Sequence, residues 1–437
     1  MARLNLALLS DDDQQLGAIP ETGEEIVTEA EELQAELPEI EEIDQVVSDA
    51  GDDAALLGDV AEAVAEAPDQ NAPIDPLAME MLQIVHRRLC TRNGFHRRAS
   101  AMESIGTGKN ARKLALEGFM DTIKRIVDGI IAGVRKAIEW VKGFFKSLFD
   151  KLGKLKKNIA VLKDKATQLK GKEATGDNAK LSGGGYVKYL TVGGKITDTG
   201  AIPTRFGTYL KAIEQIFGNE LSEERLGQVE SMLGEISKRI ATKGAADSGV
   251  DEIYVRFAKL TPNFRASADQ KGVPDGFVRG EQPLPLGDKS IFALCQKIPG
   301  EGSLSLKMHL GDTTGVKAAG GDQSHDALTA DDVVSLCSQI ESHLATYDKV
   351  DAVIKRVEGI EKSAADMAKA AQKESEEEIK GKMFLLMIAK SISSLIIRIY
   401  LTFASTLRSY DIATCAAVAG LGHASLNAIL KSNPEGK

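Results

Sequence analysis

The chain lacks the cysteine pattern of a disulfide scaffold and the N-terminal pattern of a secreted protein. Its four cysteines, Cys90, Cys295, Cys337 and Cys415, are far apart and form no Cys-x-x-Cys pair. This spacing predicts reduced, partly buried thiols in a protein made in the cytoplasm. The first residues, MARLNLALLSDDD, hold one arginine and a short apolar stretch that runs into three aspartates, so we expect no signal peptide.

Proline is missing from two long stretches, 77–202 and 300–433. A proline inside a helix costs about 3 kcal/mol, so its absence permits long helices there. Residues 383–405 are mostly apolar, but Lys390 and Arg398 divide them, so the segment has no long uncharged run. A confident transmembrane span needs about 18 apolar residues or more. We therefore predict a buried core helix over 383–405, with a helix that inserts into a membrane on demand as the open alternative.

Catalytic and metal-binding motifs are missing as well. The six histidines show neither HExxH nor His-x-His spacing, there is no GxSxG elbow, and no cysteine lies in a recognisable nucleophile context. The stretch GTGKN at 106–110 lacks the first glycine and the final Ser/Thr of a phosphate-binding loop. We predict that the protein is not an enzyme and that it has no catalytic residues, no metal and no cofactor.

What the chain does have is a strong charge asymmetry. Residues 1–80 hold 23 acidic residues and one basic residue, a net charge of −22, and residues 81–437 hold 41 acidic and 53 basic residues, a net charge of +12. The two parts sum to the overall charge of −10. Such an asymmetry is typical of an acidic tail joined to a body that meets a different partner. A tail that serves only solubility is the alternative, and composition does not decide between them.

Apolar residues in 111–165 recur every three or four positions, with a period near 3.5. This spacing predicts one long amphipathic helix, or two helices broken near Gly143 or Gly153. The helix is basic, because 112–172 holds 16 Lys/Arg and six Asp/Glu, a net charge of +10. The apolar stripe consists of Met120, Ile123, Val127, Ile130, Val134, Ile138, Val141, Phe145, Leu148, Leu152, Leu155, Ile159 and Leu162.

Three kinds of partner suit this basic helix. The first is another helix, in the same chain or in a homo-oligomer, and Gly129 and Gly133 would permit a close approach. The second is an anionic membrane, because Trp140, Phe144, Phe145 and Phe149 lie beside many lysines. The third is nucleic-acid phosphate, bound without sequence specificity. The basic residues expected to contact DNA or a partner are Lys124, Arg125, Arg135, Lys136, Lys142, Lys146, Lys154, Lys156 and Lys157.

The remaining patterns predict a mainly α fold with a small α+β middle module, in which long amphipathic helices flank short strands. Glycine-rich turns and short apolar runs predict strands in 183–198, 253–260, 276–280, 289–298 and 303–310, and two helices around 203–217 and 221–243. Thr329 is a plausible N-cap for a helix that follows it. The predicted regions are 1–103, acidic and disordered or loosely helical; 104–175, the basic helix; 183–328, the α+β module; and 329–437, helical.

One short motif occurs twice near the charge boundary. Ala-Met-Glu is found at Ala78, Met79, Glu80, where the acidic block ends, and at Ala101, Met102, Glu103. The second copy, followed by Ser104, lies in a segment of small and polar residues, RRASAMESIGTGKNAR. Proteases bind extended, flexible chain, and such segments provide it.

An acidic N-terminal segment, an Ala-x-Glu site and a net-basic remainder together resemble the processed internal head proteins of giant phiKZ-like tailed bacteriophages. In that group a prohead protease cuts after glutamate in small-x-Glu motifs. The resemblance implies cleavage after Glu103, with Ala101 and Met102 before the cut and Ser104 as the new N-terminus. Cleavage after Glu80, preceded by Ala78 and Met79, is the alternative.

The resemblance also implies a place and a set of partners. The chain would be a structural protein made in the host cytoplasm and packaged inside the capsid, in contact with other head proteins and with packaged DNA, and the mature part would be ejected with the DNA or retained. Two alternatives stay open. In the first, the chain would be a membrane-active protein that is delivered to the host cell and uses 111–165 and 383–405. In the second, it would be an assembly scaffold that leaves the capsid.

Overall fold

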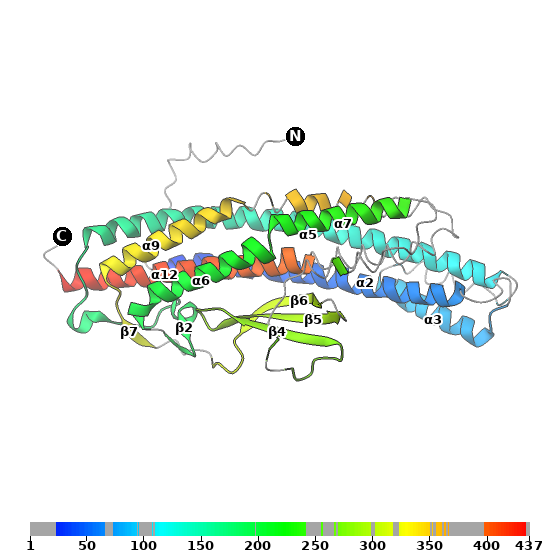
Figure 1. Cartoon of the computed structure of the whole chain (residues 1–437), viewed down its shortest axis with the longest axis horizontal. Helices are drawn as coiled ribbons and strands as arrows, with labels where there is room; N and C mark the ends of the chain where they lie inside the picture. Colours follow the sequence, from blue (N-terminus) through cyan, green and yellow to red (C-terminus); the bar gives the residue numbers. More distant parts are fainter. Residues whose placement is uncertain are drawn as a thin grey trace.

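The computed structural model contains one dominant helix, α5, from Ala111 to Gln168. At about 1.5 Å per residue this helix is about 87 Å long, and it runs along the long axis of the molecule (Figure 1). The break considered at Gly143 or Gly153 does not occur. Both glycines face open space, and the turns around them bury Phe144 and Leu152, so packing holds the helix continuous.

The structure describes most, but not all, of the chain. The described residues are 23–65, 73–93, 110–196, 198–241, 270–298, 302–317, 323–349, 355–360 and 397–433, together with a few single or paired residues between these ranges.

The acidic segment differs from the disordered or loosely helical expectation, because its described part forms packed helices. They are α1 (Gly23–Ala35), α2 (Leu37–Ala65) and α3 (Pro76–Arg92). Pro38 lies in the first turn of α2, where a proline is tolerated, and α1 ends just before it. The buried apolar side chains of α1 and α2, spaced three or four residues apart, belong to the same core as α5 and α12. Met79 of α3 instead forms a small separate cluster with Ile74 and Ala111.

The C-terminal helix α12 (Ala404–Ser432) lies at the centre of the bundle. A π-helical segment, Ile397–Phe403, precedes it. Small residues let its neighbours approach closely: at Gly422, an added Cβ would lie 3.3 Å from both Leu162 of α5 and Val333 of α9. Helix α9 (Ala330–Leu344) begins with the predicted N-cap, and Thr329 and Asp332 form a capping box.

Segment Arg398–Ser432 is long and apolar enough to cross a membrane by length and composition, yet most of its apolar window is buried inside the protein. This is the behaviour of a core helix. The predicted apolar core helix lies earlier in the chain, over 383–405, and only the end of that range belongs to the described residues.

The middle region contains small antiparallel sheets, as predicted. Strand β1 (Lys180–Ser182) pairs with β7 (Ser324–Asp326), so the two ends of the region meet. The hairpin β2–β3 (Thr191–Val192, Lys195–Ile196) turns at Gly193 (φ +67°) and Gly194 (φ +78°), and such positive φ angles suit a two-residue hairpin. A larger sheet has the order β4-β5-β6, with strands Phe277–Pro283, Lys289–Ile298 and Gly302–Asp312.

Two predicted helices of the middle region are also present, α6 (Ile202–Gln215) and α7 (Glu223–Ala241), joined through the π-helical segment Ile216–Glu220. The strand predicted over 253–260 is wrong where the structure describes it, because Val255 and Arg256 are helical. Arg256 forms an exposed ion pair with Glu235 of α7 (2.9 Å), which places this helical turn beside α7. Short 3₁₀ segments occur at Gly176–Ala179, Val187–Tyr189, Thr199–Ala201 and Ala345–Lys349.

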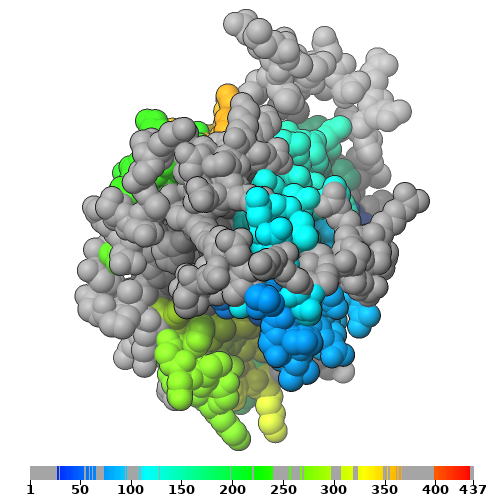
Figure 2. All heavy atoms as spheres, turned by 90° about the vertical axis from the view of Figure 1, so that its right-hand side faces the viewer, coloured from blue at the N-terminus to red at the C-terminus, as the bar shows by residue number. Residues whose placement is uncertain are grey.

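The whole molecule is an elongated helical bundle with the β4–β6 sheet on one side of α12 and α2 (Figure 1). Figure 2 looks at one end of the bundle, where α3 and the adjoining part of α2 (blue) lie beside the start of α5 (cyan) and the sheet (light green) lies below. One continuous hydrophobic core reaches from Val27 in α1 to Ile429 in α12. This core contains residues from all four predicted regions, which are 1–103, 104–175, 183–328 and 329–437.

Candidate functional site

Helix α5 presents a buried apolar stripe on one side and a row of basic side chains on the other. Of the nine predicted contact residues, seven are exposed: Arg125, Arg135, Lys136, Lys146, Lys154, Lys156 and Lys157. Lys124 and Lys142 are half-buried, and Lys142 already forms ion pairs with Glu139 (3.0 Å) and Glu358 (2.9 Å). The stripe itself packs against other helices of the same chain, which is the first of the three partners considered.

The aromatic residues that suggested a membrane surface are used inside the bundle. Phe144 and Phe145 are buried, and Trp140 and Phe149 are half-buried. Trp140 stacks on Phe144 with ring centroids 5.1 Å apart, and Phe145 lies 6.5 Å from Phe149. A membrane could reach the two phenylalanines at the centre of this row only if the bundle opened.

The acidic helices α1 and α2 cover another side of α5. Val47 of α2 sits against Gly133, where an added Cβ would come within 2.4 Å of a Val47 methyl. Only the second glycine of the Gly129–Gly133 pair makes this approach, because Gly129 faces open space. A helix–helix contact at this pair was one of the expectations, and its partner is the acidic segment.

Ion pairs join the acidic helices to the basic body. Glu32 pairs with Lys151 of α5 (2.9 Å), and this hydrogen bond lowers the pKa of the Glu32 carboxyl. Glu31 accepts hydrogen bonds from Lys188 (2.8 Å) and from the Tyr189 hydroxyl (3.0 Å). The acidic segment is therefore positioned by charge as well as by apolar contact.

A further pair lies deeper in the bundle. Asp44 of α2 meets Arg398 at 3.2 Å, and both side chains are mostly buried. Burial raises the pKa of the Asp44 carboxyl even though Arg398 opposes the shift. A desolvated pair depends on its geometry, so it fixes the position of α2 relative to the segment before α12.

The two Ala-Met-Glu motifs lie in different settings. Ala78, Met79 and Glu80 belong to the first turns of α3, where Asp75 caps the helix and the Met79 side chain is 3% exposed. Residues Ala101, Met102, Glu103 and Ser104 lie outside the described residues.

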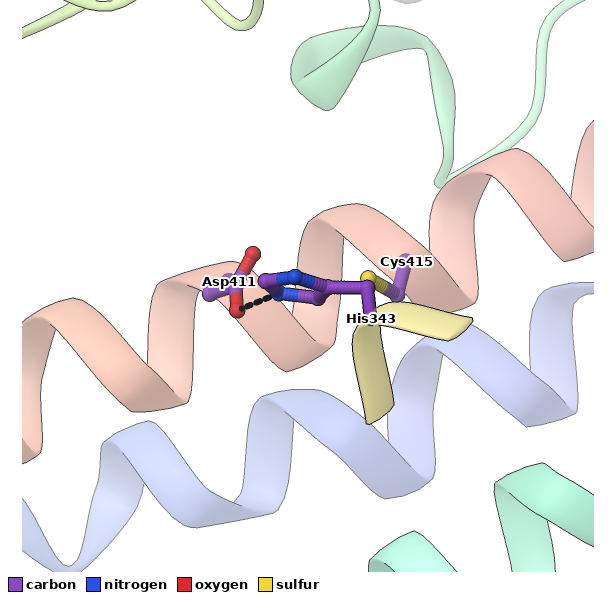
Figure 3. Close-up of side chains that lie close together, drawn as sticks. All are labelled: His343, Asp411 and Cys415. Carbon is purple, nitrogen blue, oxygen red and sulfur yellow. Dashed lines mark hydrogen bonds and ion pairs between the residues drawn. The ribbon is translucent and has the colours of Figure 1, made fainter. Parts of the chain in front are cut away.

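Sequence reasoning missed a buried polar cluster between α9 and α12. His343 of α9 donates from Nε2 to Asp411 Oδ2 (2.7 Å), and its Nδ1 lies 3.4 Å from Glu214 of α6. The Tyr347 hydroxyl donates to the same Asp411 oxygen. Figure 3 shows the His343 ring reaching from α9 toward Asp411, with Cys415 one turn further along α12. The cluster therefore ties three helices together.

Arg408 of α12 adds a second cation to this cluster. Its guanidinium carbon lies 4.2 Å from the ring centre of Phe217 and 5.3 Å from that of Tyr347, which is a cation–π arrangement. Among the described residues, Arg408 Nε and Asp411 Oδ1 have no hydrogen-bond partner. Two cations, His343 and Arg408, face two carboxylates, so the cluster is nearly neutral as a unit.

The environment sets the protonation of the cluster. Burial lowers the pKa of His343, but the Asp411 charge and the hydrogen bonds to Asp411 and Glu214 outweigh it and raise the pKa to about 9. The ring is thus an imidazolium at neutral pH. Burial raises the pKa of the Tyr347 hydroxyl well above its ordinary value, so that group stays a donor.

His343, Asp411 and Cys415 each offer one metal-ligand atom, and these atoms lie within 4.8 Å of one another. The donor chemistry fits an internal ion pair better than a metal centre. His343 Nε2 and Asp411 Oδ2 already bond each other, and the Arg408 cation lies near. Burial raises the pKa of the Cys415 thiol well above its ordinary value, so the sulfur keeps its proton.

No local pattern would have revealed this cluster, because His343 is 68 residues from Asp411 and 129 residues from Glu214 in the chain. The one hint is a charged pair, Arg408 and Asp411, inside an otherwise apolar run. A buried charge in such a run needs a partner, but the partner cannot be named without the fold.

The fold and the site together define a mainly helical protein with an exposed basic helix face and an acidic N-terminal cover. The family model for phiKZ-like phage internal head proteins matches residues 12–419. The chain belongs to this family, as its sequence suggested, and its place is therefore inside the phage head. Comparison with curated proteins gives no match, and comparison with solved structures gives none either.

Proposed function

We propose that this internal head protein is made as a precursor, is cut after Glu103 by the prohead protease, and stays in the head as the fragment that begins at Ser104. Charge supports this division. Residues 1–103 hold 24 acidic and six basic residues, a net charge of −18, and residues 104–437 hold 40 acidic and 48 basic residues, a net charge of +8. Cutting at this point turns an acidic chain into a basic one.

The helical setting of the first motif argues against Glu80 as the site of the cut. A protease must bind extended chain, whereas Ala78, Met79 and Glu80 are helical and Met79 is buried. Cleavage after Glu80 would require α3 to unwind first. Ala101 and Met102 precede the preferred cut, and Ser104 follows it.

The exposed row of lysines and arginines on α5 supports contact with packaged DNA. Lysine and arginine side chains bind phosphates without reading sequence, and such binding suits a protein that lies among densely packed DNA. This exposed face of α5 is the single observation that carries the proposal of DNA contact. Ejection with the DNA would follow from the same contacts.

Intact mass of the protein from purified virions tests the processing. We expect a chain that begins at Ser104. A chain that begins at Met81 would keep the precursor and move the cut. An uncut chain that begins at Met1 or Ala2 would overturn the precursor, and absence of the 104–437 fragment from mature particles would favour an assembly scaffold.

Salt-dependent DNA binding tests the basic face. Replacing Lys154, Lys156 and Lys157 with glutamine should weaken binding of the full chain to duplex DNA. It should also reduce the slope of log affinity against log salt, by up to about 0.9 for each phosphate that the variant no longer neutralises. The matched control removes three exposed lysines from the middle region (Lys195→Gln, Lys211→Gln, Lys317→Gln). Equal weakening in both variants would mean that only total charge matters and that the α5 face has no special role.

A further inference from the structure

Helices α1 and α2 cover one continuous apolar surface of α5 and α12, which we call the α5–α12 groove. Helix α1 packs along α12, and α2 packs along α5. The apolar side chains that α1 and α2 bury are at most 7% exposed, and they belong to the core that contains α5 and α12. They include Leu33, Ile40, Val47 and Leu57.

Polar contacts fix the position of the two helices in this groove. Glu32 reaches Lys151 on α5, and Asp44 reaches Arg398 before α12. Ser147 of α5 donates a hydrogen bond to Glu36 (2.9 Å) in the connection between the two helices. The groove therefore matches its occupant in apolar surface and in charge.

None of these contacts depends on the peptide bond after Glu103. Hydrolysis there adds one water molecule and leaves a carboxylate on Glu103 and an amino group on Ser104. The contacts that bury the side chains of α1 and α2 are all between residues that the cut leaves unchanged. Departure of the segment would expose them to water together with the apolar groove beneath them, which is strongly unfavourable.

We propose that the α5–α12 groove is a binding surface for acidic amphipathic helices, and that it retains residues 23–65 as a non-covalent partner after the cut. Cleavage alone then leaves the acidic cover in place, and a second event is needed to remove it. The proposal takes the position of the cut from the proposed function, but its contacts do not involve the natural protease.

The test uses the full chain with a recognition sequence for a site-specific protease inserted between Glu103 and Ser104. The folded protein is cut in native buffer and analysed by size-exclusion chromatography with light scattering. We expect both pieces to co-elute at the mass of the intact chain in 0.15 M and in 1 M NaCl, and to separate only in denaturant. Loss of the acidic piece in either native buffer would overturn the proposal, whether the remainder stays soluble or precipitates.

A matched pair of variants tests whether apolar contacts retain the cut acidic segment. Ile40→Ala removes a fully buried side chain from α2, and Val46→Ala makes a similar change at a position that is 62% exposed. We expect Ile40→Ala to speed dissociation of the cut segment by about thirty-fold or more, and Val46→Ala to change it less than three-fold. Equal rates in the two variants would contradict a groove held by apolar burial.

This experiment separates the two proposals. If the engineered protein retains the segment but virions contain an uncut chain, the proposed processing is refuted and the proposed binding surface still stands. If the engineered protein releases the segment promptly but the virion chain begins at Ser104, the proposed retention is refuted and the proposed processing still stands.

Discussion

The absence of a side chain at Gly133 sets how closely α5 and α2 approach each other. A Cβ at Gly133 would meet a Val47 methyl at 2.4 Å, whereas a Cβ at Gly129, one turn earlier, would meet nothing. We expect Gly133→Ala to lower the free energy of unfolding by about 1–2 kcal/mol, because overpacking outweighs the gain in helix propensity. Gly129→Ala should raise it by up to about 1 kcal/mol. Urea denaturation measures both, and equal effects would contradict the close approach.

His343 should make stability depend on pH above neutrality. Its pKa in the folded protein, about 9, lies above the ordinary value of 6.5. The protonated ring therefore stabilises the fold fully below pH 6.5, and this contribution is lost as the pH rises toward 9. The whole effect is on the order of 3 kcal/mol.

The measurement is the free energy of unfolding between pH 6 and 9.5 for the natural chain and for His343→Gln. We expect the difference between the two proteins to shrink as the pH rises through this range. A difference that stays constant would show that the ring does not titrate there, and a difference that grows would reverse the sign of the linkage.

Single residues also mark the limit of what sequence can predict. Thr329 was found as an N-cap because a capping residue and its helix are neighbours in the chain. His343 was not linked to Asp411, because that pair exists only when α9 and α12 pack together. The spacing of Leu336, Ile340 and His343 puts His343 on the apolar face of α9, but this spacing does not identify the partner of the ring.

At the level of elements, the capping box of α9 should be measurable on its own. Thr329 accepts a hydrogen bond from the Asp332 amide, and Asp332 accepts one from the Thr329 amide. We expect Thr329→Ala to cost about 1 kcal/mol of stability. Ser338→Ala, on the exposed face of the same helix, should be neutral or slightly stabilising. Equal losses in thermal denaturation would argue against a role for the cap.

The most predictable elements are helices in which the apolar pattern repeats over a long stretch of sequence. The stripe of α5 is local information, so the helix and its buried face followed from spacing alone, and only its continuity through Gly143 and Gly153 had to come from packing. For α1 and α2, the high density of acidic residues predicted a disordered or loosely helical segment. Their acidic residues favour expansion, but the apolar residues between them find a face on α5 and α12 that the sequence does not reveal.

For the whole molecule, one shared core predicts that the acidic segment unfolds together with the body. We expect the amide hydrogens of Ile40 and Val47 to exchange only through the same global opening as those of Cys415 and Val418 in α12, because all four residues lie in that core. Amides of the short β2–β3 hairpin should exchange much faster. Native-state hydrogen exchange measures this, and rapid exchange throughout α2 would contradict a shared core.

The contact between α1 and α12 also orders events during synthesis of the protein. Helix α12 leaves the ribosome long after α1, and the two helices need each other to bury their apolar surfaces. The bundle can close only after translation of α12 is complete, so the nascent chain carries unfinished acidic helices for most of its synthesis. Their negative charge keeps such a chain soluble and apart from its copies until the final helix arrives.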